Sequence, residues 1–81
     1  MYTFYVSLSS IGDVKQFVAA ANNCPCEVDV LSDRYVINAK SIMGLFSLDL
    51  THPVKVQTHG TDEQGKSFRA SVDPFVTQDG E

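Results

Sequence analysis

The sequence predicts an α+β fold, an open-faced β-sandwich in which a four-stranded antiparallel sheet carries three helices on one face. Apolar residues alternate along four short segments, as in half-buried strands. Three other segments begin at a capping residue, as helices do. The order is strand, helix, strand, strand, helix, strand, helix, which favours this sandwich. The 81 residues fit one domain; we expect residues 1–76 to form it and residues 77–81 to be a flexible tail.

The N-terminal part of the chain predicts a strand followed by an amphipathic helix. Between Tyr2 and Leu8, aromatic and aliphatic side chains occupy every second position, which is typical of a half-buried strand. Ser10 can cap the helix, with Asp13 as the acidic partner of a capping box. The helix extends to about Asn22. Its predicted apolar stripe consists of Ile11, Val14, Phe17, Val18 and Ala21.

The rest of the chain predicts a hairpin, a fourth strand and a last helix. Residues 27–31 and 35–37 form the hairpin, with Ser32 and Asp33 in its turn. The fourth strand covers residues 54–58.

Thr61 and Gln64 form a capping box for the last helix. Gly65 weakens this helix and Pro74 ends it. The apolar stripe of the helix contains Phe68 and Val72.

A short helix between Asn38 and Leu50 is too apolar to be covered fully by its own domain. Ser41 can cap it. Its apolar residues fall on two sides of a helical wheel: Leu45 and Leu48 on one, and Ile42, Met43 and Phe46 on the other. A short surface helix buries one stripe against a small core, so we expect the other set to be exposed as a docking surface. The alternative is that both sets are core.

Composition argues against several classes of function. Ten acidic and six basic residues give a formal net charge of −4, which disfavours nucleic acid and anionic membrane surfaces as partners. No apolar run reaches the roughly 20 residues of a membrane-spanning helix. The N-terminus lacks the basic region and long apolar core of a secretory signal. We therefore expect a cytoplasmic protein.

Cys24 and Cys26 are separated only by Pro25. A structural zinc site needs about four ligands, and His52 and His59 fit no familiar zinc spacing with these cysteines. We expect no metal and no other cofactor, and we interpret the cysteines as reduced thiols in a turn. A redox role or a soft-metal site is the alternative for a Cys-x-Cys pair.

Residues 38–48 closely resemble the regulatory-serine segment of HPr, the phosphocarrier of the bacterial phosphoenolpyruvate-dependent sugar phosphotransferase system. They are even more similar to catabolite-repression HPr, its Gram-positive paralogue. Weaker similarity at residues 16–21 and 60–64 extends the resemblance over residues 14–72. The resemblance implies the HPr fold, a cytoplasmic carrier or regulator that is not an enzyme, a role in carbon catabolite repression and a Gram-positive source.

The carrier chemistry of the HPr family is missing from this sequence. In HPr, a histidine at the start of the first helix carries the phosphate, and an arginine and a proline follow closely. Aligned by the first helix, these positions fall at Ser10, Gly12 and Asp13, so Ser10 and Gly12 mark a vestigial phosphocarrier site. Asp13 would repel a phosphoryl group, and neither His52 nor His59 aligns with the carrier histidine. Ser10 is interpreted as an N-cap, with phosphate acceptance as the alternative.

Ser41 aligns with the serine that HPr kinase/phosphorylase modifies in the family. A phosphate there would add a charge of about −2 beside the positive end of a helix dipole, and Lys40 adjoins it. The alternative is that Ser41 is only an N-cap. By resemblance, the residues that contact partner proteins are Lys40, Ile42, Met43 and Phe46. The partners are HPr kinase/phosphorylase, phosphotransferase-system enzymes or the catabolite control transcription factor.

We therefore predict a regulatory or protein-interaction module without the carrier histidine; phosphorylation at Ser41 is the control that the resemblance suggests. The main alternative is a phosphocarrier with a non-standard acceptor. A redox or metal role for Cys24 and Cys26 is a third hypothesis. The sequence leaves the oligomeric state open.

Overall fold

An antiparallel sheet forms one layer of the computed structural model, which describes residues 2–32, 35–48 and 50–77. The described residues form five strands: β1 (Tyr2–Val6), β2 (Val28–Ser32), β3 (Tyr35–Asn38), β4 (Val54–Thr58) and β5 (Val76–Thr77). Their spatial order is β3-β2-β4-β1-β5, and every neighbouring pair is antiparallel. The predicted open-faced α+β sandwich is confirmed, but the predicted number of four strands is wrong.

The additional strand, β5, lies where the sequence indicates only the end of the domain. Val76 pairs with Val6 and Thr77 with Tyr5, along the free edge of β1. A two-residue strand is too short to show an alternating pattern. It forms because the edge groups of β1 require hydrogen-bond partners. Thr77 is therefore in the sheet, whereas residues 78–81 of the predicted tail lie outside the described residues.

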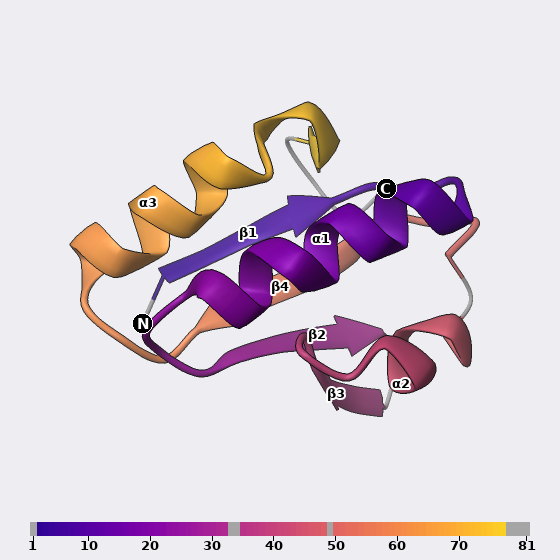
Figure 1. Cartoon of the computed structure of the whole chain (residues 1–81), viewed down its shortest axis with the longest axis horizontal. Coiled ribbons are helices and arrows are strands. Elements are labelled where there is room, and N and C mark those ends of the chain that lie inside the picture. The colour runs from indigo at the N-terminus through magenta and orange to yellow at the C-terminus, as the bar shows by residue number, and fades with distance from the viewer. Residues whose placement is uncertain (1, 33–34, 49, 78–81) are drawn as a thin grey trace.

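Within the described part of the chain, three helices accompany the sheet: α1 (Ile11–Asn23), α2 (Ile42–Phe46) and α3 (Asp62–Ser71). Figure 1 shows α1 running along β1 and β4, with α3 on the β1 side and α2 near β2 and β3. A 3₁₀ turn, η1 (Asp73–Phe75), follows α3 and contains Pro74. None of these helices is long and apolar enough to cross a membrane.

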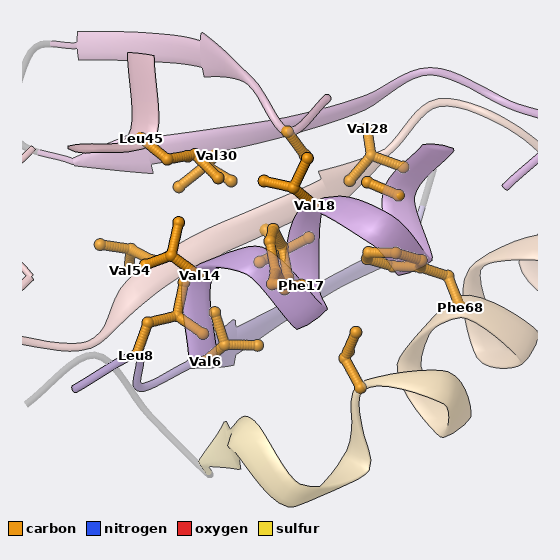
Figure 2. Close-up of a cluster of buried hydrophobic side chains, with 14 of the residues drawn as sticks. Val6, Leu8, Val14, Phe17, Val18, Val28, Val30, Leu45, Val54 and Phe68 are labelled. Atoms are coloured by element: carbon orange, nitrogen blue, oxygen red, sulfur yellow. The ribbon is translucent and has the colours of Figure 1, made fainter. Parts of the chain in front are cut away.

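The core is centred on Phe17 of α1, which is fully buried. Its ring meets that of Phe68 edge-on, with 5.5 Å between ring centroids, and Phe68 lies 6.1 Å from Phe4 of β1. Such aromatic pairs contribute about 0.5–1.5 kcal/mol beyond their buried area. Figure 2 shows Phe17 surrounded by aliphatic side chains from the sheet and from α1. The predicted stripe residues Val14, Phe17, Val18 and Ala21 are all buried.

Ile11 is an exception to the predicted stripe, because 65% of its surface is exposed. It is the first residue of α1. Side chains on a helix lean toward its N-terminus, so this side chain extends past the part of α1 that the sheet covers. Helical spacing alone does not show where the sheet ends.

The predicted helix starts are present, and one predicted turn residue, Ser32, lies in a strand instead. Thr61 and Gln64 form the full capping box, with hydrogen bonds of 3.0 and 3.1 Å. The last helix ends at Ser71, before Pro74. Ser32, predicted in the hairpin turn, pairs with Tyr35 at the end of β2, and Asp33 lies outside the described residues.

Gly65 is a residue at which α3 packs closely against the sheet. A Cβ at this position would lie 2.2 Å from the Cβ of Tyr2 and 2.6 Å from Oγ1 of Thr58. The hydroxyl of Thr58 donates to the carbonyl of Tyr2 at 3.1 Å, so the neighbouring atoms belong to a fixed, buried arrangement. Gly65 permits this close approach, although it weakens the helix locally.

We expect Gly65→Ala to lower the free energy of unfolding by about 1–3 kcal/mol, because the added methyl overpacks the contact. The helix propensity of alanine, about 1 kcal/mol better than that of glycine, only partly offsets this effect. Urea unfolding followed by circular dichroism measures the change. The control is Gly12→Ala, where the nearest atom to the new Cβ is Oγ of Ser10 at 3.7 Å. Equal effects of the two substitutions would contradict this account.

Candidate functional site

A groove of about 480 Å³ opens beside the start of α1. One wall is the link between β1 and α1, residues 7–10, together with Ile11. The other wall is formed by Phe46 at the end of α2 and by residues 50–51. The groove thus brings Ser10, the predicted vestigial carrier position, to the same place as Phe46 of the predicted docking helix.

Ser10 is engaged as the N-cap of α1. Its Oγ accepts a hydrogen bond from the backbone N–H of Asp13 at 3.1 Å. The reciprocal half of the predicted capping box is shifted by one residue. Oδ2 of Asp13 accepts from the backbone N–H of Ser9 at 3.1 Å and from its hydroxyl at 3.0 Å. Gly12 lies in the first turn of α1 and is exposed.

Asp13 makes the start of α1 negative at neutral pH. The hydrogen bond from the backbone N–H of Ser9, followed by that from the Ser9 hydroxyl, holds the pKa of Asp13 below its ordinary value. Its carboxylate occupies the first turn, where the helix dipole favours negative charge. The positive end of the helix dipole, which would attract a phosphate, is therefore already offset by the carboxylate of Asp13.

The α2 helix buries one side chain completely, that of Leu45. Met43 is 76% exposed and Phe46 is 42% exposed. At about 100° per residue, Met43 lies about 200° around the helix from Leu45, and Phe46 about 100°. Ile42 lies only about 60° from Leu45, which explains why it is partly buried against the core. Two of the three residues in the predicted exposed set are thus exposed, and Ile42 is intermediate.

We use the term apolar patch for Ile11, Met43 and Phe46, which are large, exposed hydrophobic residues on α1 and α2. Ile11 and Phe46 line the same groove. Sequence reasoning placed Ile11 in the core and so missed it as a surface residue. Its position directly after the N-cap was the available signal. Exposed apolar groups gathered around a groove are typical of a protein interaction site.

Ser41 is exposed and caps α2, its Oγ accepting from the backbone N–H of Gly44 at 3.3 Å. The turn before it is held by Asn38. The side-chain Oδ1 of Asn38 accepts from the N–H of Lys40 at 2.8 Å, and its carbonyl accepts from the N–H of Ser41 at 2.9 Å. Lys40 is half-buried beside this turn. The Ser41 hydroxyl is therefore in a defined position and accessible from solvent.

The two histidines of the chain flank β4 at opposite ends, on the order of 20 Å apart given about 3.3 Å per strand residue. Nε2 of His59 lies 2.8 Å from Oδ2 of Asp29. His52 is exposed and follows Thr51, which lines the groove. Of the two, only His52 is near the groove.

Residues 13–70 match the family PTS-HPr, described as the PTS HPr component phosphorylation site. The chain belongs to the HPr family. It is also similar to a solved structure, the phosphocarrier protein HPr from Bacillus anthracis str. Ames, with a TM-score of 0.68 and 26% sequence identity. That similarity covers 86% of this chain and 94% of the other. A comparison with curated proteins found no match.

Family membership confirms the resemblance drawn from residues 38–48 and the HPr-like fold. HPr proteins are phosphocarriers that interact with other proteins of the phosphotransferase system and are not themselves catalysts. The family match begins at Asp13, after Ser10 and Gly12.

Protonation of Asp13 tests the structure of the helix start. The pKa of Asp13 is lowered in the folded chain. Above the unfolded-state pKa of about 3.9, the ionised carboxylate therefore stabilises the folded state. This stabilisation is lost as the pH falls through the folded-state pKa. We expect a carboxyl NMR titration to give a midpoint below about 3.9. Ser9→Ala should raise the midpoint only part-way, because the backbone donor remains. A midpoint at or above the ordinary value in the wild-type chain would contradict these hydrogen bonds.

Proposed function

We propose that this HPr-family chain is a regulatory protein that docks to other proteins through its apolar patch and does not carry phosphate on a histidine. The observation that carries the proposal is the exposure of Met43, at 76%, in a helix whose one fully buried residue is Leu45. Exposed methionine is adaptable and suits a surface that binds protein partners. Phe46 and Ile11 extend the apolar surface to the groove.

The start of α1 supports the absence of carrier activity. Residues 7–13 contain no histidine and no arginine. The hydroxyl of Ser10 is occupied as an N-cap, and the carboxylate of Asp13 supplies negative charge where a carrier site needs positive charge. A phosphoryl group at this end of the groove would face repulsion instead of stabilisation.

Phosphorylation of Ser41 is the proposed control of docking. A phosphate there would place about two negative charges beside the start of α2, within two residues of Met43. Lys40 is next to it and can partly neutralise the charge. The same patch would then present two different surfaces to a partner, apolar before modification and apolar with an adjacent dianion after it.

The proposed partners follow from the family: HPr kinase/phosphorylase, enzymes of the phosphotransferase system and the catabolite control transcription factor. We propose a cytoplasmic, Gram-positive setting and a role in carbon catabolite repression on the same basis.

Incubation with HPr kinase/phosphorylase and ATP tests the regulatory site. We expect intact-mass analysis to show one added phosphate and fragment masses to place it on Ser41. Ser41→Ala should remain unmodified, whereas Ser10→Ala should be modified like the wild type. Absence of phosphate on this chain, in a reaction that phosphorylates a conventional HPr, would contradict the proposed control.

A phosphocarrier with a non-standard acceptor is the second candidate. The observation that favours it is the position of Thr51 in the groove, which brings the exposed His52 to the same end of the molecule as Ser10. Imidazole is the acceptor that carriers of this family use.

Labelled phosphoenolpyruvate and the first enzyme of the phosphotransferase system distinguish the two functions. The docking proposal predicts no acid-labile phosphate on this chain. Acid-labile phosphate that is lost in His52→Ala and retained in His59→Ala would establish the carrier function and overturn the docking proposal. His59 is the matched control because it flanks the other end of β4.

A further inference from the structure

The link between α1 and β2 places two sulfur atoms in contact. Sγ of Cys24 and Sγ of Cys26 lie 3.3 Å apart, and both residues are free cysteines. Cys24 is 8% exposed, and its backbone N–H closes the end of α1 by donating to the carbonyl of Ala21. Cys26 is half-buried. The two thiols therefore meet in a partly buried position of the fold.

The turn between β4 and α3 fixes Cys26 from the other side. A Cβ on Gly60 would lie 2.7 Å from Cβ of Cys26 and 3.0 Å from its Sγ, so this turn packs closely on the thiol. Burial raises the pKa of Cys26, and the neighbouring Cys24 sulfur raises it further, against the opposing effect of the backbone N–H groups of Cys26 and Gly60. The raised pKa lowers the fraction of Cys26 that is thiolate, so Cys26 is the less reactive nucleophile of the pair.

Cys24 can be reached from a hollow between α1 and α3. This hollow has a volume of about 380 Å³, and its lining includes Cys24, Pro25, Asn23 and Gln64. Among the described residues, no group of three or more His, Cys, Asp or Glu side chains could hold a metal ion. The geometry offers two thiols in contact, of which Cys24 lines the hollow.

We propose that Cys24 and Cys26 form a dithiol site that undergoes thiol–disulfide exchange with low-molecular-weight disulfides. The thiolate of Cys24 attacks one sulfur of the small disulfide, and the bond between the two small-molecule sulfurs breaks. The first small thiolate leaves and takes up a proton. Cys26 then loses its proton and attacks Sγ of Cys24, which releases the second small thiol. The protein loses two electrons and two protons, and the small disulfide gains them and is reduced to two thiols.

The protein disulfide formed in this way would be easily reversed. The sulfurs must close from 3.3 Å to about 2.05 Å. A ring with only one intervening residue is small and strained, and strained disulfides are the labile, regulatory ones. Closure would also move the sulfur of Cys26, which packs against Gly60, the residue directly before the capping residue of α3. Oxidation would therefore be sensed in the β4–α3 turn. The site lies outside the groove and does not depend on the proposed docking function.

Oxidised glutathione is the probe for this site. We expect the native chain to lose two hydrogen atoms by intact mass, to lose both free thiols and to retain no glutathione. Dithiothreitol should restore the starting mass, and the NMR signal of the Gly60 amide should shift on oxidation. Cys26→Ser should stop at the glutathione adduct on Cys24, because the second thiol is missing. Cys24→Ser should form its adduct more slowly, because a smaller fraction of Cys26 is thiolate.

Two results would overturn the proposal. One is a native chain that keeps both thiols while the same chain in urea is oxidised, which would show that the fold protects the pair. The other is oxidation that gives a stable glutathione adduct on the wild-type chain or a disulfide between two chains, because the fold would then not favour closure of the Cys24–Cys26 ring.

Discussion

The burial of Leu45 positions α2, and the candidate site depends on it. A helix of five residues is not stable alone in water. Burying a leucine side chain contributes about 1.5–3 kcal/mol, which makes Leu45 the main attachment of this helix to the core. Hydrogen bonds at its two ends, from the N–H of Gly44 to Oγ of Ser41 and from the hydroxyl of Ser47 to the carbonyl of Gly44, hold the single turn in shape. With Leu45 directed inward, helical geometry directs Met43 outward.

The same arrangement joins two parts of the chain that are far apart in sequence. Phe46 reaches the groove beside Ser10 and Ile11, so a protein seated on the apolar patch would also cover the start of α1. Asp13 gives that start a negative charge, which is compatible with protein docking and unfavourable for phosphate binding. The lack of histidine and arginine in residues 7–13 and the exposed apolar side chains of α2 are both consistent with the proposed docking function. Ser41 caps the helix that carries Met43 and Phe46, so a charge added there would lie beside the apolar patch.

Local patterns in the sequence predicted most of the fold. The spacing of apolar residues and the capping residues depend only on neighbours a few positions away in the sequence. The stripe around Phe17 and the capping box of Thr61 and Gln64 are examples. Features set by distant contacts were not predictable. β5 exists because β1 has a free edge, Ile11 is exposed because the sheet ends before it, and Gly65 is required by Tyr2. The helical wheel grouped Ile42 with Met43 in the exposed set. Ile42 is partly buried because it lies only about 60° around the helix from Leu45. The close packing of Cys26 against Gly60, a residue of a distant turn, was likewise not predictable.

The affinity of this chain for HPr kinase/phosphorylase, measured by calorimetry without ATP, tests the docking surface most directly. We expect Met43→Lys to weaken binding by at least about tenfold, equivalent to about 1.4 kcal/mol, because it replaces the most exposed apolar side chain of the patch by a charge. Val36→Lys is the matched control, because Val36 is 62% exposed but lies on β3, and its affinity should equal that of the wild type. Equal affinities of all three chains, or no binding by the wild type, would contradict the account.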